Sequence, residues 1–299
     1  MPETLVVRPQ HTLRQTAEVS GVGYWSGRPN RVELRPSSVG SGVVFVRDDL
    51  PVPVRIPASV EYRVDAATRT NLSVAGVGVQ MVEHVLSALS GLNVDCCEVH
   101  VTAEELPGLD GSSRAFVDAI DEVGLEELGA PVVPLVVSRV IRLGDDISWI
   151  EVGPPQFPGL SVEYELDYGH VAIGRQSMRV DVTPDAYRDQ LSSARTFLPV
   201  EEADRLQASG RGLSVGHRDL LVFGPSGPIG NTLRWDDECV RHKVLDVVGD
   251  LSLVGRPVYA SVRACRSGHK LNAEMVARLI AEEYGGMNVS GVGGAGQCQ

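Results

Sequence analysis

The sequence predicts an α+β fold in which each half of the chain forms a sheet covered by helices on one face. In both halves of the 299-residue chain, short runs rich in β-branched residues precede segments with helical periodicity. Aromatic residues make up only 5%, whereas Val and Gly are plentiful, which favours strands and tight turns. The chain is long for one average domain, so we expect two.

The first half is expected to contain five strands followed by helices. The strands are predicted at residues 31–35, 42–47, 52–56, 71–74 and 98–102. A first helix is predicted where Val82, Val85, Leu86 and Leu89 share one helical face. A second helix is expected over residues 113–123, where apolar residues recur at similar spacing.

Residues 126–134 contain Gly129 and two prolines between patterned regions, so we expect a linker there. It would join an N-terminal α+β domain, residues 1–129, to a C-terminal α+β domain, residues 130–284. In the second half, strands are predicted near residues 135–142, 148–152, 160–166 and 176–182, and helices near 184–191, 201–208, 236–254 and 271–284. Residues 285–299 are Gly-rich and are expected to form a disordered tail.

Composition excludes some classes of partner. The formal net charge of −12 argues against nucleic-acid binding, which needs a basic surface. No apolar run approaches the ~18–20 residues that a membrane span requires. The five cysteines contain no C-x-x-C pair, and residues 1–4 show no export signal. We therefore expect a cytoplasmic protein with reduced thiols and no transmembrane segment.

The most informative pair of residues is His242 and Asp246. They are four residues apart, so on a helix both side chains leave the same face, one turn apart. This spacing suits two ligands of one metal ion, and the pair Glu83 and His84 could supply a third ligand with a carboxylate beside it. Three protein ligands and one open position are typical of a catalytic zinc site. The sequence therefore points to metal-assisted hydrolysis.

Solvated helix faces are the competing interpretation for both pairs, and each pair alone would favour it. Gly249 weighs against it, because glycine costs a helix ~1 kcal/mol relative to Ala. At Gly249, within the polar arc of its helix, only close approach by another group would justify that cost. In the functional interpretation His84 binds the metal, and Glu83 acts as the general base.

Other candidate residues extend this site. His269, in the turn before the last predicted helix, could act as a general acid or stabilise an oxyanion, and Asp250 could orient it. Lys243 borders the polar arc and could reach an anionic ligand. Thr196 offers a hydroxyl donor to a carbonyl oxygen. We interpret residues 105–112 as a structural turn into a helix capped near Ser112.

Several segments, taken in order, resemble UDP-3-O-acyl-N-acetylglucosamine deacetylase, the zinc enzyme that commits sugar nucleotides to lipid A synthesis. They are residues 82–92 (VEHVLSALSGL), 105–107 (ELP), 110–112 (DGS), 194–197 (ARTF), 237–238 (DE), 241–243 (RHK), 245–246 (LD), 249–251 (GDL) and 267–269 (SGH). The resemblance extends from about residue 10 to residue 283. After Gly-Val-Gly, however, the family usually carries Leu-His, where this chain has Tyr24 and Trp25.

The resemblance implies two similar two-layer α/β sandwich domains, packed face to face with the active site between them. It implies that the chain is a metal-dependent amide hydrolase. Zinc would be held by His84, His242 and Asp246, and Glu83 would be the base.

Further roles are implied by the same resemblance. His269, paired with Asp250, would protonate the leaving amine or stabilise charge, and Thr196 would polarise the acetamide carbonyl. Lys243 would lie near polar groups of the substrate, and Phe197 near its nucleotide or sugar.

The implied substrate is a UDP-linked acylated amino sugar, and we expect the protein to be a monomer. An apolar passage for the fatty acyl chain would include Leu213 and Val215, within residues 212–216.

Two alternatives remain on the sequence alone. The chain could be a non-catalytic relative that holds a UDP-sugar or an acyl chain, although such a relative is expected to lose a ligand or the base, and none is lost here. A purely structural metal would require a fourth protein ligand, for which the sequence offers no convincing candidate.

Overall fold

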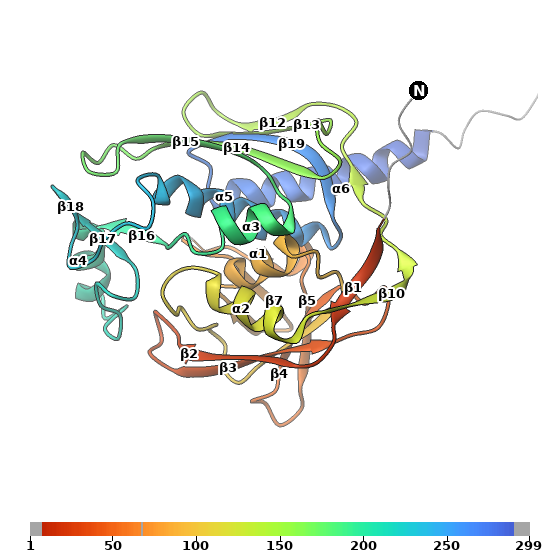
Figure 1. The fold of residues 1–299 in the computed structure, drawn as a ribbon, viewed down its shortest axis with the longest axis horizontal. Helices are drawn as coiled ribbons and strands as arrows, with labels where there is room; N and C mark the ends of the chain where they lie inside the picture. Colours follow the sequence, from red (N-terminus) through yellow and green to blue (C-terminus); the bar gives the residue numbers. More distant parts are fainter. Residues whose placement is uncertain (1–7, 67, 290–299) are drawn as a thin grey trace, which may run out of the picture.

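In the computed structural model, which describes residues 8–66 and 68–289, two sheets enclose a layer of helices (Figure 1). The first sheet has the order β2 (Ala17–Val22), β3 (Pro29–Pro36), β9 (Cys97–Val101), β4 (Val43–Arg47) and β5 (Val54–Pro57). The second has the order β12 (Ile141–Gly144), β13 (Trp149–Gly153), β19 (Val258–Cys265), β14 (Leu160–Asp167) and β15 (Arg175–Asp181). The short strand β11 (Leu135–Val136) also pairs with β19.

The two sheets repeat one topology. In each, the central strand runs parallel to one neighbour (β4 or β14) and antiparallel to the other (β3 or β13), and both outer pairs are antiparallel. A helix precedes each central strand and another follows it. The preceding helices are α1 (Glu83–Gly91) and α5 (Glu238–Leu251), and the following helices are α2 (Arg114–Val123) and α6 (His269–Val289). The predicted α+β class, with two similar halves, is confirmed.

Helices α1 and α5 pack against each other at the centre of the molecule (Figure 1). Both are buried along nearly their whole length, as expected for helices enclosed between two sheets. Their backbones come close together at Gly249, where an added Cβ atom would lie 2.3 Å from the carbonyl oxygen of Glu83. The close approach inferred from Gly249 is therefore confirmed.

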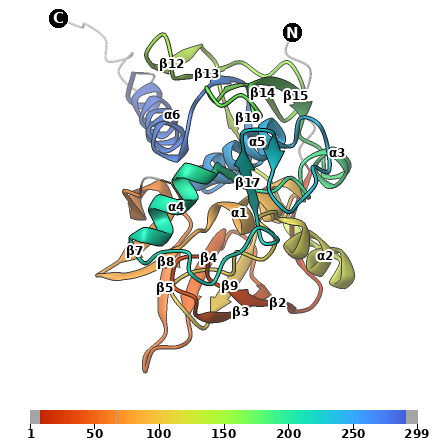
Figure 2. The ribbon, with the colours of Figure 1, turned by 90° about the vertical axis from the view of Figure 1, so that its left-hand side faces the viewer.

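A smaller lobe projects from one end of the molecule, at the left of Figure 1 and facing the viewer in Figure 2. It contains α4 (Val200–Ala208) and a three-stranded sheet of β16 (Phe197–Pro199), β17 (Leu221–Gly224) and β18 (Gly227–Pro228). Another small sheet is formed by β6 (Arg63–Val64), β7 (Asn71–Val74) and β8 (Val77–Gln80). The other helical elements of the described residues are α3 (Pro184–Gln190) and two 3₁₀ turns, η1 (Val60–Tyr62) and η2 (Ser252–Val254).

The predicted linker is largely a strand, so that expectation was wrong in its local structure. Strand β10 (Leu125–Pro131) pairs antiparallel with β1 (Pro9–Leu13) in a separate two-stranded sheet. Pro9 and Pro131 face each other in this pair, and a two-stranded ribbon tolerates proline because every strand has a free edge. The predicted boundary between residues 129 and 130 falls inside β10.

Two further predictions are corrected at the level of single elements. Residues 135–142 do not form one strand but contribute to β11 and β12, which are separated by residues 137–140. Helix α6 continues through Val289, so residues 285–289 belong to a helix and not to a disordered tail. The remainder of the predicted tail, residues 290–299, lies outside the described residues.

In the described part of the chain, each helix is either too short or too polar to span a membrane. Free thiols are found at four cysteines, Cys96, Cys97, Cys239 and Cys265. Cys298 lies outside the described residues.

Candidate metal centre and active site

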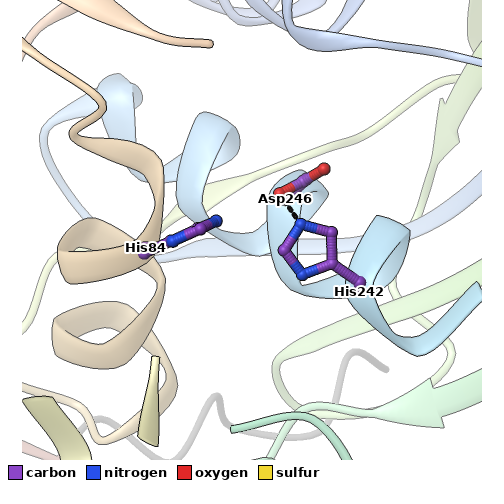
Figure 3. Close-up of side chains that lie close together, drawn as sticks. All are labelled: His84, His242 and Asp246. Atoms are coloured by element: carbon purple, nitrogen blue, oxygen red, sulfur yellow. Dashed lines mark ion pairs between the residues drawn. The ribbon is translucent and has the colours of Figure 1, made fainter. Parts of the chain in front are cut away.

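Three buried side chains converge where α1 faces α5 (Figure 3). His84 extends from α1 toward His242 and Asp246, which leave the same face of α5 one turn apart. One potential ligand atom from each residue lies within 4.8 Å of the other two, and the imidazole centroids are 5.2 Å apart. The close approach of the helices at Gly249 therefore brings together side chains that are more than 150 residues apart in sequence.

The surroundings keep these groups in the protonation states that metal binding requires. Burial, together with the neighbouring His242, lowers the pKa of His84 to about 3. Burial also lowers the pKa of His242. Burial by itself would raise the pKa of Asp246, but the adjacent His242 and the positive charge of Lys243 hold it well below its ordinary value. Two neutral imidazoles and a carboxylate form a suitable donor set for a divalent metal.

The hydrogen bonds also leave donor atoms free for a metal. His242 donates its Nδ1 proton to the carbonyl oxygen of Ala194 at 3.0 Å, so its Nε2 lone pair is available. That Nε2 lies 3.4 Å from Asp246 Oδ1. Among the described residues, Asp246 Oδ1 is buried and has no hydrogen-bond partner. Because an unsatisfied buried acceptor is costly, a cation at this position fits the residues present.

Glu83 lies beside His84 at the start of α1 and is buried with it. Its Oε2 accepts a hydrogen bond from the backbone N–H of Thr70 at 2.9 Å. Burial raises the pKa of Glu83 to about 7, although the positive charge of His269 opposes that shift. A carboxyl group with a pKa near 7 is suited to take up a proton at neutral pH.

His269 is the first residue of α6, the helix that follows the central strand of the second sheet, and it lies beside the same centre. Its Nδ1 lies 2.9 Å from Asp250 Oδ2, and its Nε2 lies 4.0 Å from Asp246 Oδ2, so Nε2 faces the metal-binding group. Burial by itself would lower the pKa of His269, but the charge and hydrogen bond of Asp250 raise it to about 9. The imidazolium is thus a proton donor at neutral pH, beside a carboxyl group suited to accept one.

Asp250 has partners that the sequence did not identify. It accepts hydrogen bonds from the Thr70 hydroxyl at 2.6 Å and from the Asn272 side-chain amide at 2.8 Å, in addition to His269. Asn272 follows His269 by three residues on α6, and this spacing is a sequence signal because residues three apart lie on the same face of a helix. Thr70 lies in a loop and belongs to no motif, so no sequence signal marked it.

Lys243 is turned toward the site, but its partner is Asp246, whose Oδ2 lies 2.6 Å from Nζ. Burial alone would lower the pKa of Lys243, but the charge of Asp246 raises it. Phe197 also faces the site, with its ring centroid 6.4 Å from that of His242. The backbone N–H of Thr196 donates to the carbonyl of Gly111 at 2.8 Å, and Thr196 is half-buried.

A buried ion pair fixes the segment that carries Thr196 and Phe197. Arg195 binds both carboxylate oxygens of Glu238, at 2.7 Å and 3.0 Å. Glu238 is the first residue of α5 and is fully buried. This bidentate contact joins the segment that leads into the small lobe to α5, the helix that carries His242 and Asp246.

The proposed acyl-passage residues lie in the small lobe and not at the metal-binding group. Leu213 is 72% exposed, whereas Val215 packs against an apolar cluster that includes Tyr24 and Leu220. Tyr24 is a buried member of this cluster. A Cβ atom on Gly108 would lie 2.0 Å from the Tyr24 ring, so glycine at 108 makes room for this side chain.

Residues 105–112 have the structural role that the sequence suggested. The carboxylate of Glu105 accepts the backbone N–H groups of Trp25 and Ser26, both at 2.7 Å. Asp110 accepts hydrogen bonds from both the backbone and the hydroxyl of Ser112. Helix α2 begins at Arg114, two residues after the expected cap.

One cavity of about 560 Å³ lies away from this centre. Its lining includes Leu89 and Ser90, at the C-terminal end of α1, and Ser252, which directly follows α5. It contains none of the candidate site residues.

The repeated α+β unit and the buried His–His–Asp group define a protein with a candidate metal-binding catalytic centre on two equivalent helices. Comparison with known families matches residues 10–281 to the LpxC family, UDP-3-O-acyl N-acetylglycosamine deacetylase. The chain belongs to this family. It is therefore a deacetylase-family hydrolase of lipid A biosynthesis.

Proposed function

We propose that the protein is a zinc-dependent deacetylase that converts UDP-3-O-acyl-N-acetylglucosamine to UDP-3-O-acyl-glucosamine and acetate. The observation that carries the proposal is the convergence of His84, His242 and Asp246 around a buried carboxylate oxygen that has no partner among the described residues. Family membership supports the substrate class.

His84, His242 and Asp246 would hold the metal. Two imidazoles and one carboxylate leave an open position on a tetrahedral ion, and zinc accepts this ligand set in hydrolases. When bound, zinc polarises the carbonyl oxygen and lowers the pKa of water.

The proton transfers are carried out by side chains of the protein. Glu83 removes a proton from the attacking water, whose oxygen bonds to the acetamide carbon. Thr196 donates a hydrogen bond to the carbonyl oxygen as negative charge develops there. His269 then delivers its Nε2 proton to the amide nitrogen as the carbon–nitrogen bond breaks, and acetate and the free amine leave. Asp250 holds the His269 ring in the orientation that this transfer needs.

Substrate recognition is proposed to involve both the centre and the small lobe. Phe197 is beside His242 and would contact the sugar or nucleotide. Lys243, one-fifth exposed, would approach polar groups of the substrate while remaining paired with Asp246. Leu213 and Val215 would line the passage for the acyl chain, and the active unit would be a monomer.

The proposal is tested by incubating the purified protein with UDP-3-O-acyl-N-acetylglucosamine and measuring acetate and free amine together. We expect equal amounts of the two products. The deacetylated product, offered as a control substrate, should release no acetate. Tight binding of the substrate without any acetate release would contradict the proposal and favour a non-catalytic binding protein.

A further inference from the structure

Thr70 connects two carboxylates that belong to different halves of the molecule. It immediately precedes β7 and is completely buried. Its backbone N–H donates to Glu83 Oε2 at 2.9 Å, and its hydroxyl donates to Asp250 Oδ1 at 2.6 Å. Its carbonyl oxygen accepts the N–H of Val82 at 3.1 Å, which ties the loop to the start of α1. One residue therefore spans the groups beside which the reaction is proposed to occur.

The hydroxyl hydrogen bond determines how the Asp250 carboxylate is turned. Oδ2 accepts a hydrogen bond from the Asn272 side-chain amide at 2.8 Å. It also accepts the shorter of the two contacts from His269 Nδ1, at 2.9 Å. Oδ1 receives the short hydrogen bond from Thr70, with His269 Nδ1 farther away at 3.2 Å. Without the Thr70 hydroxyl, the two shortest remaining hydrogen bonds, from Asn272 and His269, would both fall on Oδ2. The Asp250 carboxylate could then rotate about that oxygen.

We propose that Thr70 is a positioning residue for deacetylation. Its hydroxyl fixes the carboxylate of Asp250, and through Asp250 the ring of His269. Its backbone N–H holds the carboxylate of Glu83 in place. The distance between the proton acceptor, Glu83, and the proton donor, His269, is therefore kept constant. This inference rests on the proposed function and adds a residue to it that no motif contains.

A purely structural threonine would behave differently. Replacing Thr70 by Val keeps the side-chain volume and the backbone hydrogen bonds but removes the hydroxyl. A structural role predicts a loss of stability with little change in turnover. A positioning role predicts a loss of kcat that disappears once His269 is gone, because residues that act through one another are not additive.

The experiment compares wild type with Thr70→Val, Thr70→Ser, His269→Gln and the Thr70→Val/His269→Gln double variant. Thr70→Val is expected to lower kcat by roughly 10-fold to 100-fold, the effect usual for a lost supporting hydrogen bond at a metal site, with KM and bound metal unchanged. Thr70→Ser keeps the hydroxyl and should recover most of the activity. In the His269→Gln background, Thr70→Val should change kcat by less than about 2-fold.

A second measurement does not depend on activity. In protein labelled with ¹⁵N at histidine, the His269 Nδ1 proton should shift or broaden in Thr70→Val and remain as in wild type in Thr70→Ser. Thr12→Val is a matched control, since Thr12 is also buried and its hydroxyl oxygen accepts the Ser37 N–H far from the site. That control should change neither kcat nor the His269 resonance. If Thr70→Val does not fold, Thr70→Ala replaces it with the same expectation.

The inference is overturned if Thr70→Val retains kcat within about 2-fold of wild type, or if its effect multiplies with that of His269→Gln. It is also overturned if the His269 resonance is unmoved. Failure of the proposed function is a separate result, because then the wild-type protein itself would release no acetate.

Discussion

Replacing Glu83 by Gln is expected to lower kcat by about 10²–10⁴-fold, the usual cost of losing a general base. Gln has nearly the same shape, and its amide oxygen can still accept the Thr70 N–H, so the start of α1 should remain in place. It cannot take up the proton of the attacking water. His84 is untouched, and the metal content should stay at the wild-type level. Acetate release and metal analysis on the same sample measure both quantities.

Glu105→Gln is the matched control for this change. Glu105 is also a buried carboxylate that accepts backbone N–H groups, but its partners are Trp25 and Ser26. Its replacement should leave kcat within a few-fold of wild type. A Glu83→Gln protein that binds metal and turns over at the wild-type rate would refute the assignment of Glu83 as the base.

Gly249→Ala is expected to disrupt the centre by separating α1 from α5. The new Cβ would lie 2.3 Å from the carbonyl oxygen of Glu83, and no rotamer change can relieve a clash with backbone. Alanine favours a helix by ~1 kcal/mol, but overpacking typically costs ~1–3 kcal/mol. Relief requires α1 to move, and with it Glu83 and His84. Because a displacement near 1 Å can cost ~10²-fold in rate, activity should fall far more than stability.

The measurements for this variant are kcat, metal content and the midpoint of thermal unfolding. Gly129→Ala is the control, because a Cβ at Gly129 meets no atom within 4 Å and its backbone does not require glycine. It should behave as wild type in all three. If Gly249→Ala kept both its metal and its activity, the contact between the helices would not be what assembles the site.

The sequence predicts features that depend on neighbouring residues along the chain. The periodicity of α1 and α5 and the four-residue spacing of His242 and Asp246 are of this kind, because a helix repeats every 3.6 residues wherever it lies. The glycine in the polar arc of α5 also carried long-range information, since only contact with another element explained its cost. These features were enough to predict an α+β fold and a candidate ligand group.

Features that arise from long-range packing were predicted less well. Strand β19 is the central strand of the second sheet, yet the sequence did not identify it. Its buried positions are Val258, Ala260, Val262 and Ala264, and the small alanines weaken the alternating apolar pattern. Gly and Pro in residues 126–134 indicated a loop, but pairing with β1 makes most of that segment a strand.

Thr70 illustrates the same limit at the site. Its contacts to Glu83 and Asp250 exist only because the loop before β7 lies where α1 meets α5. These contacts join residues 13 and 180 positions away in sequence. No local pattern encodes such a pair of separations.

The repeated topology explains why the centre forms at this position. Helices α1 and α5 occupy equivalent places before the central strands β9 and β19, and they meet between the two sheets. Each contributes at least one candidate ligand, so neither half alone carries the complete group. Folding of both halves is therefore required before the metal site can exist.

The most direct test of the account is metal analysis coupled to acetate release, before and after chelation. We expect the purified protein to contain a single zinc ion per chain, to lose zinc and activity together with a chelator, and to recover both when zinc is restored. His242→Ala should neither hold zinc nor release acetate. Undiminished acetate release by the metal-free protein would contradict the account.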